Sequence, residues 1–159
     1  VRERIKPAWF EQLLLDPKSL GMNTRMPIFW DAQGISAART LLDGYIAAFE
    51  RSDARLLEEV LRTDATLEAT PFREWYAGRV KCIHMLDAYV LGAPGDWQMI
   101  ATTANGQPAA VVYNRDTDGA LRAHGIVVLA PTATGVSRVI EFHDPALFAT
   151  FGFPDVLAD

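Results

Sequence analysis

Three polar side chains stand out because each lies in otherwise apolar or β-rich surroundings. They are Tyr45, Glu68 and His124. A carboxylate or a histidine can accept and return a proton, and a tyrosine hydroxyl can donate a hydrogen bond to a developing oxyanion. These three residues are therefore the catalytic candidates if the chain is a small enzyme, a cyclase, isomerase or hydrolase, acting on an apolar substrate.

Each candidate also has a purely structural interpretation. A buried tyrosine usually finds one hydrogen-bond partner in the core. Glu68 fits the polar face of a half-buried antiparallel strand, and a buried neutral histidine such as His124 is often bonded to the backbone. The sequence leaves both interpretations open for all three residues, and it favours the structural one.

The other candidate groups have the wrong spacing for shared chemistry. His143 and Asp144 are adjacent, so a strand or turn points them apart. Cys82 and His84 are two positions apart on an expected helix and do not face each other. The sequence has no phosphate-binding loop and no dinucleotide fingerprint. It therefore predicts no metal site and no cofactor.

Helices in the first half of the domain must position these residues. Ser36 is the expected N-cap of a long helix, which has apolar residues at helical spacing: Ala38, Leu41, Leu42, Tyr45, Ile46 and Phe49. Asp53 is the expected cap of a second helix that ends near residues 62–64. A strand over 65–70, a loop over 72–78 and a third helix over 80–91 follow.

The second half has the pattern of a sheet. Turn signals at 105–106, 118–119 and 134–135 separate four expected strands, near 97–103, 108–115, 120–130 and 136–143. The tail, 145–154, is apolar enough to pack back as a short helix or turn. The pattern predicts an α+β fold, with three helices packed on a curved antiparallel sheet and a pocket between the first helix and the sheet.

Five residues are expected to line this pocket: Tyr45, Phe49, Trp75, Tyr76 and His124. Trp75 and Tyr76 lie in the expected loop after the first strand, near the mouth of the pocket. Large aromatic side chains there act either as a lid over a ligand or as a seal on the core, and the sequence does not decide between these roles.

Composition limits the possible partners and location. The net charge is −5 and the 15 basic residues are scattered, so we expect no direct nucleic-acid binding. One cysteine and the lack of a signal-peptide or membrane-span pattern favour the cytoplasm. Residues 1–35 form an expected extension to a domain over 36–159. The exposed aromatic residues of that extension would dock on the domain or on a second copy, as in a homodimer.

Several motifs resemble known proteins. The runs at 41–53 (LLDGYIAAFERSD), 64–68 (DATLE) and 75–79 (WYAGR) resemble the SnoaL-like superfamily, which has the cone-shaped nuclear-transport-factor-2-like fold and includes ketosteroid isomerases and polyketide cyclases. A further set is similar to the C-terminal SnoaL-like domain of actinobacterial extracytoplasmic-function (ECF) sigma factors of the sigma-G type. This set comprises GAPGDW at 92–97, NGQPA at 105–109, AHG at 123–125 and FHDPALF at 142–148.

The resemblance implies a regulatory domain that follows two sigma regions, which bind DNA and RNA polymerase. Its implied partners are those sigma regions or the polymerase, and its pocket would bind a protein region or a small apolar ligand. The 35 residues before the domain are too few for both sigma regions. Two alternatives therefore stay open, a domain of a longer sigma factor and a free-standing relative.

The catalytic pattern of ketosteroid isomerases is mostly absent. Their base is a carboxylate just before the proline that ends the first strand, and here that position is Thr70. Their second acid lies in a strand that reads Gly-Ile-Val-Val-Leu at 125–129 in this chain. Only the helix tyrosine, Tyr45, is present, so isomerase chemistry by that route is disfavoured.

Overall fold

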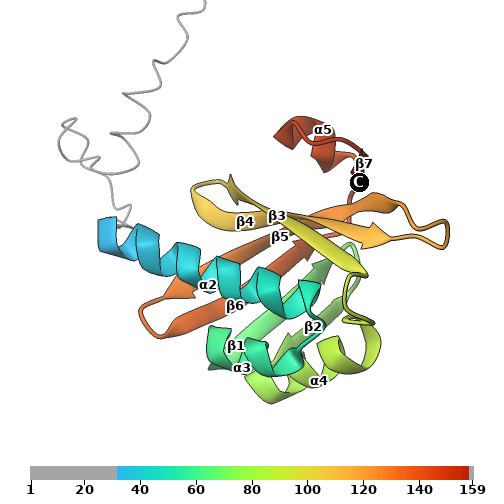
Figure 1. Cartoon of the computed structure of the whole chain (residues 1–159). Coiled ribbons are helices and arrows are strands. Elements are labelled where there is room, and N and C mark those ends of the chain that lie inside the picture. The colour runs from blue at the N-terminus through green and yellow to red at the C-terminus, as the bar shows by residue number, and fades with distance from the viewer. Residues whose placement is uncertain (1–31, 158–159) are drawn as a thin grey trace, which may run out of the picture. The chain divides into compact units, whose positions relative to one another are not determined.

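The computed structural model describes residues 32–157 of the chain (Figure 1). The expected extension therefore lies outside the described residues, apart from its last four positions. Four helices are present in the described part: α2 (Ala32–Glu50), α3 (Ala54–Val60), α4 (Arg79–Tyr89) and α5 (Leu147–Phe151). None of these helices is both long enough and apolar enough to cross a membrane.

The strands form one curved, open sheet. They are β1 (Leu61–Thr70), β2 (Glu74–Ala77), β3 (Trp97–Ala104), β4 (Gln107–Arg115), β5 (Leu121–Thr132), β6 (Gly135–Phe142) and β7 (Val156–Leu157). The order across the sheet is β2-β1-β6-β5-β4-β3, and β7 pairs with β5. The α+β class and the curved sheet agree with the prediction from the sequence.

One strand pair departs from the antiparallel pattern that was predicted. β1 and β6 run parallel, with Leu67 beside Val139. The strands β3 to β6 follow one another through short turns, which forces them to alternate in direction. β1 reaches β6 through a long connection that includes α4, and such a connection permits a parallel pair.

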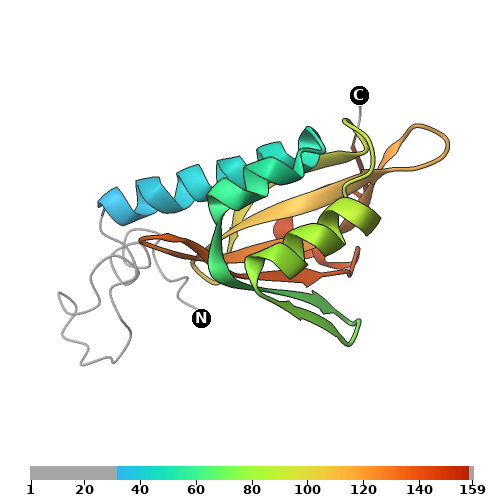
Figure 2. The ribbon, with the colours of Figure 1, turned by 90° about the horizontal axis from the view of Figure 1, so that it is seen from below.

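Helices α2, α3 and α4 lie on the same face of the sheet (Figure 2). The apolar stripe predicted for α2 is buried at Leu42, Tyr45 and Phe49. These side chains form one core with Leu57 of α3, Leu86 of α4 and residues of the sheet. The helical spacing of apolar residues therefore predicted correctly which side of α2 faces the sheet.

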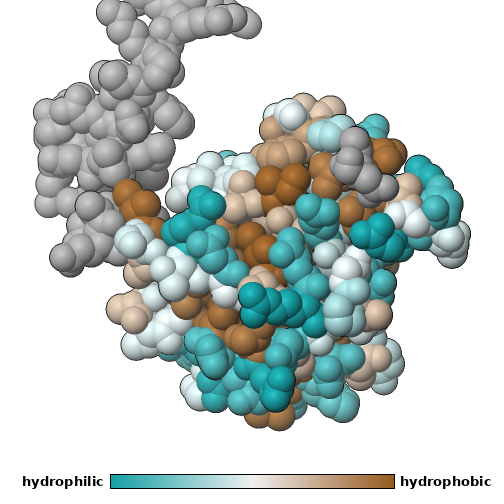
Figure 3. Space-filling view, viewed as in Figure 1, coloured by the Kyte–Doolittle hydropathy of each residue, from teal (hydrophilic) through white to brown (hydrophobic). Residues whose placement is uncertain are grey.

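The C-terminal tail covers part of the opposite face. Phe148 of α5 is fully buried and meets Tyr113 of β4 at a ring-centroid distance of 5.0 Å, edge to face. The Tyr113 hydroxyl donates a hydrogen bond of 2.9 Å to the carbonyl of Pro154. Apolar residues gather around α5 on the surface shown in Figure 3. The expected packing of the tail is confirmed.

Several boundaries differ from those predicted. α2 begins at Ala32, four residues before the expected cap Ser36. Asp53 does cap α3 by accepting a hydrogen bond from the Arg55 backbone N–H, but α3 ends at Val60 because β1 begins at once. Residues 74–77 form strand β2 rather than a loop, because pairing with β1 satisfies their backbone polar groups.

Truncating Phe148, the residue through which the C-terminal tail packs on the sheet, should destabilise the domain. We expect Phe148→Ala to lower the free energy of unfolding by about 3–5 kcal/mol, because the side chain is fully buried and leaves a cavity. Chemical denaturation monitored by circular dichroism measures the change. Val80→Ala is the control, since Val80 is 80% exposed and should change stability little. Equal stability of the two variants would contradict the packing of α5.

Candidate functional site

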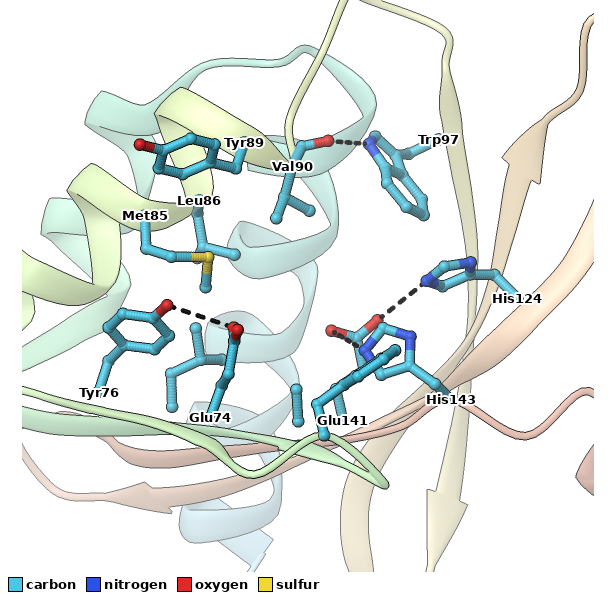
Figure 4. Close-up of a pocket in the computed structure, with 13 residues that line it drawn as sticks. Glu74, Tyr76, Met85, Leu86, Tyr89, Val90, Trp97, His124, Glu141 and His143 are labelled. Atoms are coloured by element: carbon cyan, nitrogen blue, oxygen red, sulfur yellow. Dashed lines mark hydrogen bonds and ion pairs between the residues drawn. The ribbon is translucent and has the colours of Figure 1, made fainter.

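A pocket of about 270 Å³ lies between α4, the β1–β2 hairpin and the ends of β5 and β6 (Figure 4). Most of its wall is apolar, and the side chains include Leu67, Ala69, Met85, Leu86, Val90 and Trp97. Glu74, Tyr76 and Tyr89 add polar atoms from β2 and α4. This lining suits a small molecule with an apolar body.

Three titratable residues meet at one end of the pocket: His124, Glu141 and His143. His124 Nε2 lies 3.7 Å from Glu141 Oε1, and His143 Nε2 lies 3.4 Å from Glu141 Oε2 (Figure 4). The Glu141 side chain is only 12% exposed. The two imidazoles therefore approach one largely buried carboxylate from different strands.

Glu141 lies at the end of β6, and His143 directly follows the last residue of this strand. They are two positions apart, so an extended backbone points both side chains to the same face, while Phe142 between them points outward and is 38% exposed. The His143 backbone N–H donates a hydrogen bond of 2.8 Å to the carbonyl of Thr70, the last residue of β1. This bond fixes the backbone just beyond β6.

A β-bulge in β5 turns His124 toward the pocket. Val112 of β4 pairs with Gly125, but the next residue, Tyr113, pairs with Ala123, which leaves His124 without a partner on β4. Ala123 and Ile126 both pack on the outer core under α5. The extra residue therefore shifts the alternation of side chains, and His124 faces the pocket.

Gly125 allows β5 and β6 to meet closely beside this bulge. A Cβ atom built on Gly125 would lie 2.4 Å from the carbonyl oxygen of Phe142 and 3.3 Å from the Cα of His143. Both obstacles belong to the backbone, so they cannot rotate away. Only glycine permits this spacing of the two strands at the site.

Aromatic rings continue the cluster on both sides. Trp97 meets His124 at a centroid distance of 5.0 Å, and His124 meets His143 at 4.8 Å. Phe72 meets His143 at 5.0 Å, and all three contacts are edge to face. Trp97 Nε1 donates a hydrogen bond of 2.9 Å to the carbonyl of Val90, which ties the row of rings to the end of α4.

The two histidines have pKa values shifted in opposite directions. Burial lowers the pKa of His124, although the charge of Glu141 opposes this effect and His143 adds to it. Interaction with the Glu141 carboxylate raises the pKa of His143 above its usual range, against a smaller effect of burial. Near neutral pH, His124 therefore favours its neutral form more strongly than His143 does.

Tyr45 lies in the core rather than in the pocket wall. It is 1% exposed and packs on Phe49 at a ring-centroid distance of 4.9 Å. Burial raises the pKa of its hydroxyl well above the usual value, and the nearby charge of Glu141 raises it further. Within residues 32–157 the hydroxyl has no hydrogen-bond partner, so it is a buried polar group close to the titratable cluster.

The other predicted site residues fall into two groups. Tyr76 and His124 line the pocket. Phe49 is a core residue that contacts Trp97, and Trp75 is 60% exposed and does not line the pocket. Glu68 also lies outside the pocket, where it forms an ion pair of 2.7 Å with Arg138.

Glu141 and His143 are site residues that the sequence analysis missed. In the sequence His143 stands out only beside its neighbour Asp144, and Glu141 lies within the expected strand near 136–143 without any special signal. The signal that identifies them is their spacing of two in an extended segment, which places a carboxylate and an imidazole on one face.

The chain is similar in sequence to part of a sigma factor. It is 43% identical over 124 residues to the "ECF RNA polymerase sigma factor SigG" of Mycobacterium tuberculosis. The match covers 76% of this chain but 32% of SigG, so the chain spans about a third of the length of that relative. No protein-family model matches the chain.

Solved structures with the same fold include two bacterial proteins. A candidate ketosteroid isomerase from Kribbella flavida has a TM-score of 0.54 and 24% identity, over 67% of this chain and 77% of that one. An NTF-2-like protein of unknown function from Burkholderia xenovorans has a TM-score of 0.56 and 10% identity, over 74% and 94% of the two chains. At these identities the likeness shows the fold alone.

Adding a methyl group at Gly125 should disturb the site. We expect Gly125→Ala to lower the free energy of unfolding by about 1–3 kcal/mol, because the new Cβ overlaps the backbone of β6 and the strands must separate. Thermal or chemical denaturation measures the loss, and histidine NMR signals report the displacement of His124 and His143. Thr103→Ala, at an exposed position of β3, is the control. Unchanged stability and unchanged histidine signals would contradict the close strand contact.

Proposed function

We propose that this chain, which has the SnoaL-like fold and resembles part of sigma factor SigG, is a regulatory domain that binds a small, largely apolar molecule in its pocket. The observation that carries the proposal is the pocket itself, with apolar walls and a titratable cluster at one end. The similarity to SigG supports a role in transcription and hence a cytoplasmic location.

The lining indicates the chemistry of the ligand. A cavity of about 270 Å³ is near the lower limit for small-molecule sites. Leu67, Met85 and Trp97 favour an apolar body, and His124 and His143 can hydrogen-bond a polar group at its end. We therefore expect a compact ligand with one hydrogen-bonding or anionic group that faces the cluster.

The proposed protein partner is the sigma-factor machinery. The part of SigG that this chain does not match makes up about two thirds of SigG and is where the partner regions would lie. With a net charge of −5, the chain itself is poorly suited to contact nucleic acid. Binding to sigma regions or to RNA polymerase, changed by the ligand in the pocket, is the proposed mode of regulation.

A second candidate function is a small enzyme, a cyclase, isomerase or hydrolase acting on an apolar substrate. The observation that favours it is the presence of His124, Glu141 and His143 in the pocket, with Tyr45 nearby. Against it, Thr70 stands where the isomerase base is expected and Glu68 lies outside the pocket. If this chain is an enzyme, its catalytic residues therefore differ from those of ketosteroid isomerases.

Filling the pocket should weaken binding of an apolar probe. We expect 8-anilinonaphthalene-1-sulfonate, an aromatic body with one anionic group, to bind the wild-type chain at one saturable site. Ala69→Phe should weaken this binding at least tenfold, because Ala69 lines the pocket and a phenyl ring occupies the space. Fluorescence titration measures the affinity. Ala77→Phe, on the exposed part of β2, is the matched control. Equal binding by both variants would contradict the proposed site.

The regulatory role is tested with the remainder of SigG. That remainder, produced as a separate polypeptide, should bind this chain with a measurable, saturable affinity in isothermal titration calorimetry. 8-Anilinonaphthalene-1-sulfonate bound in the pocket should change the affinity between the two polypeptides. Ala69→Phe should remove this effect of the probe. Failure to bind, together with turnover of a small molecule by the chain, would favour the enzyme instead.

A further inference from the structure

We propose that His124, Glu141 and His143 form a three-ligand binding site for one divalent transition-metal ion of the zinc or ferrous class. The sequence alone predicted no metal site. This inference goes beyond the proposed regulatory function and does not depend on which molecule occupies the pocket.

The distances within the cluster suit metal coordination. Zinc binds histidine nitrogen and carboxylate oxygen at about 2.0–2.2 Å, so ligand atoms around a tetrahedral ion lie about 3.3–3.6 Å apart. The two nitrogen–oxygen distances here are 3.4 and 3.7 Å. One potential ligand atom from each of the three residues lies within 4.8 Å of the other two. Small side-chain movements suffice to close this set around an ion.

The orientation of the two imidazole rings also suits the coordination of one metal ion. The planes of His124 and His143 are inclined by 83°, with centroids 4.8 Å apart. Each ring turns its Nε2 atom toward a different oxygen of Glu141, as Figure 4 shows. The two imidazoles therefore direct their Nε2 atoms at one carboxylate instead of stacking face to face.

An ordinary ion pair accounts for only part of the cluster. The 3.4 Å contact between His143 and Glu141 explains one histidine. His124 lies 3.7 Å from the carboxylate, beyond hydrogen-bond distance, and its ring nitrogens make no hydrogen bond to any residue in the range 32–157. No protein hydrogen bond therefore has to be broken for a His124 nitrogen to coordinate an ion.

The donor types indicate which ions are suitable. Two imidazoles and one carboxylate are typical ligands of zinc and of non-haem ferrous iron, whereas magnesium and calcium prefer oxygen donors alone. The carboxylate supplies one negative charge against the charge of the ion, and among residues 32–157 no lysine or arginine lines the pocket to oppose binding. The site therefore selects for late divalent transition metals.

The ligands are held by rigid backbone. The bulge in β5 orients His124, and Gly125 brings this bulge against β6. The hydrogen bond from His143 N–H to the Thr70 carbonyl holds the third ligand beyond the strand end. Sites built on strands in this way keep their ligand geometry and lose little entropy when the ion binds.

A fourth coordination position would face the pocket, because all three ligands line it. Three protein ligands with one open position are typical of zinc sites that bind an exchangeable water or a ligand atom. In this pocket the ion would bind the polar end of a molecule whose apolar body contacts Leu67, Met85 and Trp97.

Metal binding is tested on the whole chain after treatment with a chelator. We expect isothermal titration with Zn²⁺ to give one ion per chain, and Co²⁺ to give the visible absorption of a low-coordinate site that Zn²⁺ displaces. Anaerobic titration with Fe²⁺ distinguishes a ferrous site. Bound Zn²⁺ should also raise the melting temperature, by an amount that grows with the logarithm of the Zn²⁺ concentration above the dissociation constant.

Variants identify the ligands. His143→Ala, His124→Ala and Glu141→Gln should each weaken Zn²⁺ binding at least tenfold, with His143→Asn and His124→Gln as second choices if an alanine variant fails to fold. His84→Ala is the matched control, because His84 is the third histidine of the chain and lies exposed on α4. Absence of stoichiometric binding, equal binding by folded ligand variants, or an equal loss in His84→Ala would overturn the proposal.

The metal site and the pocket ligand can be separated. Met85→Trp, on the α4 wall of the pocket opposite Glu141 (Figure 4), should weaken binding of 8-anilinonaphthalene-1-sulfonate at least tenfold but leave Zn²⁺ bound, because Met85 contributes no metal ligand. Loss of Zn²⁺ binding in this variant, with the fold retained, would place the ion elsewhere in the pocket and contradict the assignment.

Discussion

The contact between β5 and β6 at Gly125 determines the geometry of the whole site. The backbone of β6 lies so close that no side chain fits at this position. The same stretch of β5 contains the extra residue that turns His124 inward, and the facing end of β6 carries Glu141 and His143. The bulge beside this tight strand contact therefore brings His124 to the face on which the regular alternation of β6 already places Glu141 and His143.

The sequence predicted the architecture better than the site. Helical periodicity identified α2 and its buried face, and turn residues separated β3 to β6 correctly, because these signals are local. The parallel β1–β6 pair and strand β2 depend on contacts between distant or weakly patterned segments, and no local signal encodes them. The site depends on a bulge, and a bulge changes the direction of a side chain without changing composition.

The candidate residues illustrate the same distinction. The apolar stripe of α2 predicted that Tyr45 and Phe49 reach the pocket. Both side chains are instead buried in the core that α2 forms with the sheet. Glu68 obeyed strand alternation and pairs with Arg138 on the other side of β1. The polar end of the pocket is made instead by residues near the ends of β5 and β6, where the strands depart from regular geometry.

The pairing of β1 with β6 has a consequence for the order of events during synthesis. The paired residues Thr66 and Arg138 are separated by about 70 positions, so this contact closes a long loop and belongs to the slow, non-local part of folding. On the ribosome, α2 to β5 can emerge while one wall of the pocket is still missing. The pocket and its histidines come together only after β6 has left the exit tunnel, so the proposed ligand and metal sites are complete only once residues up to about 143 have been translated.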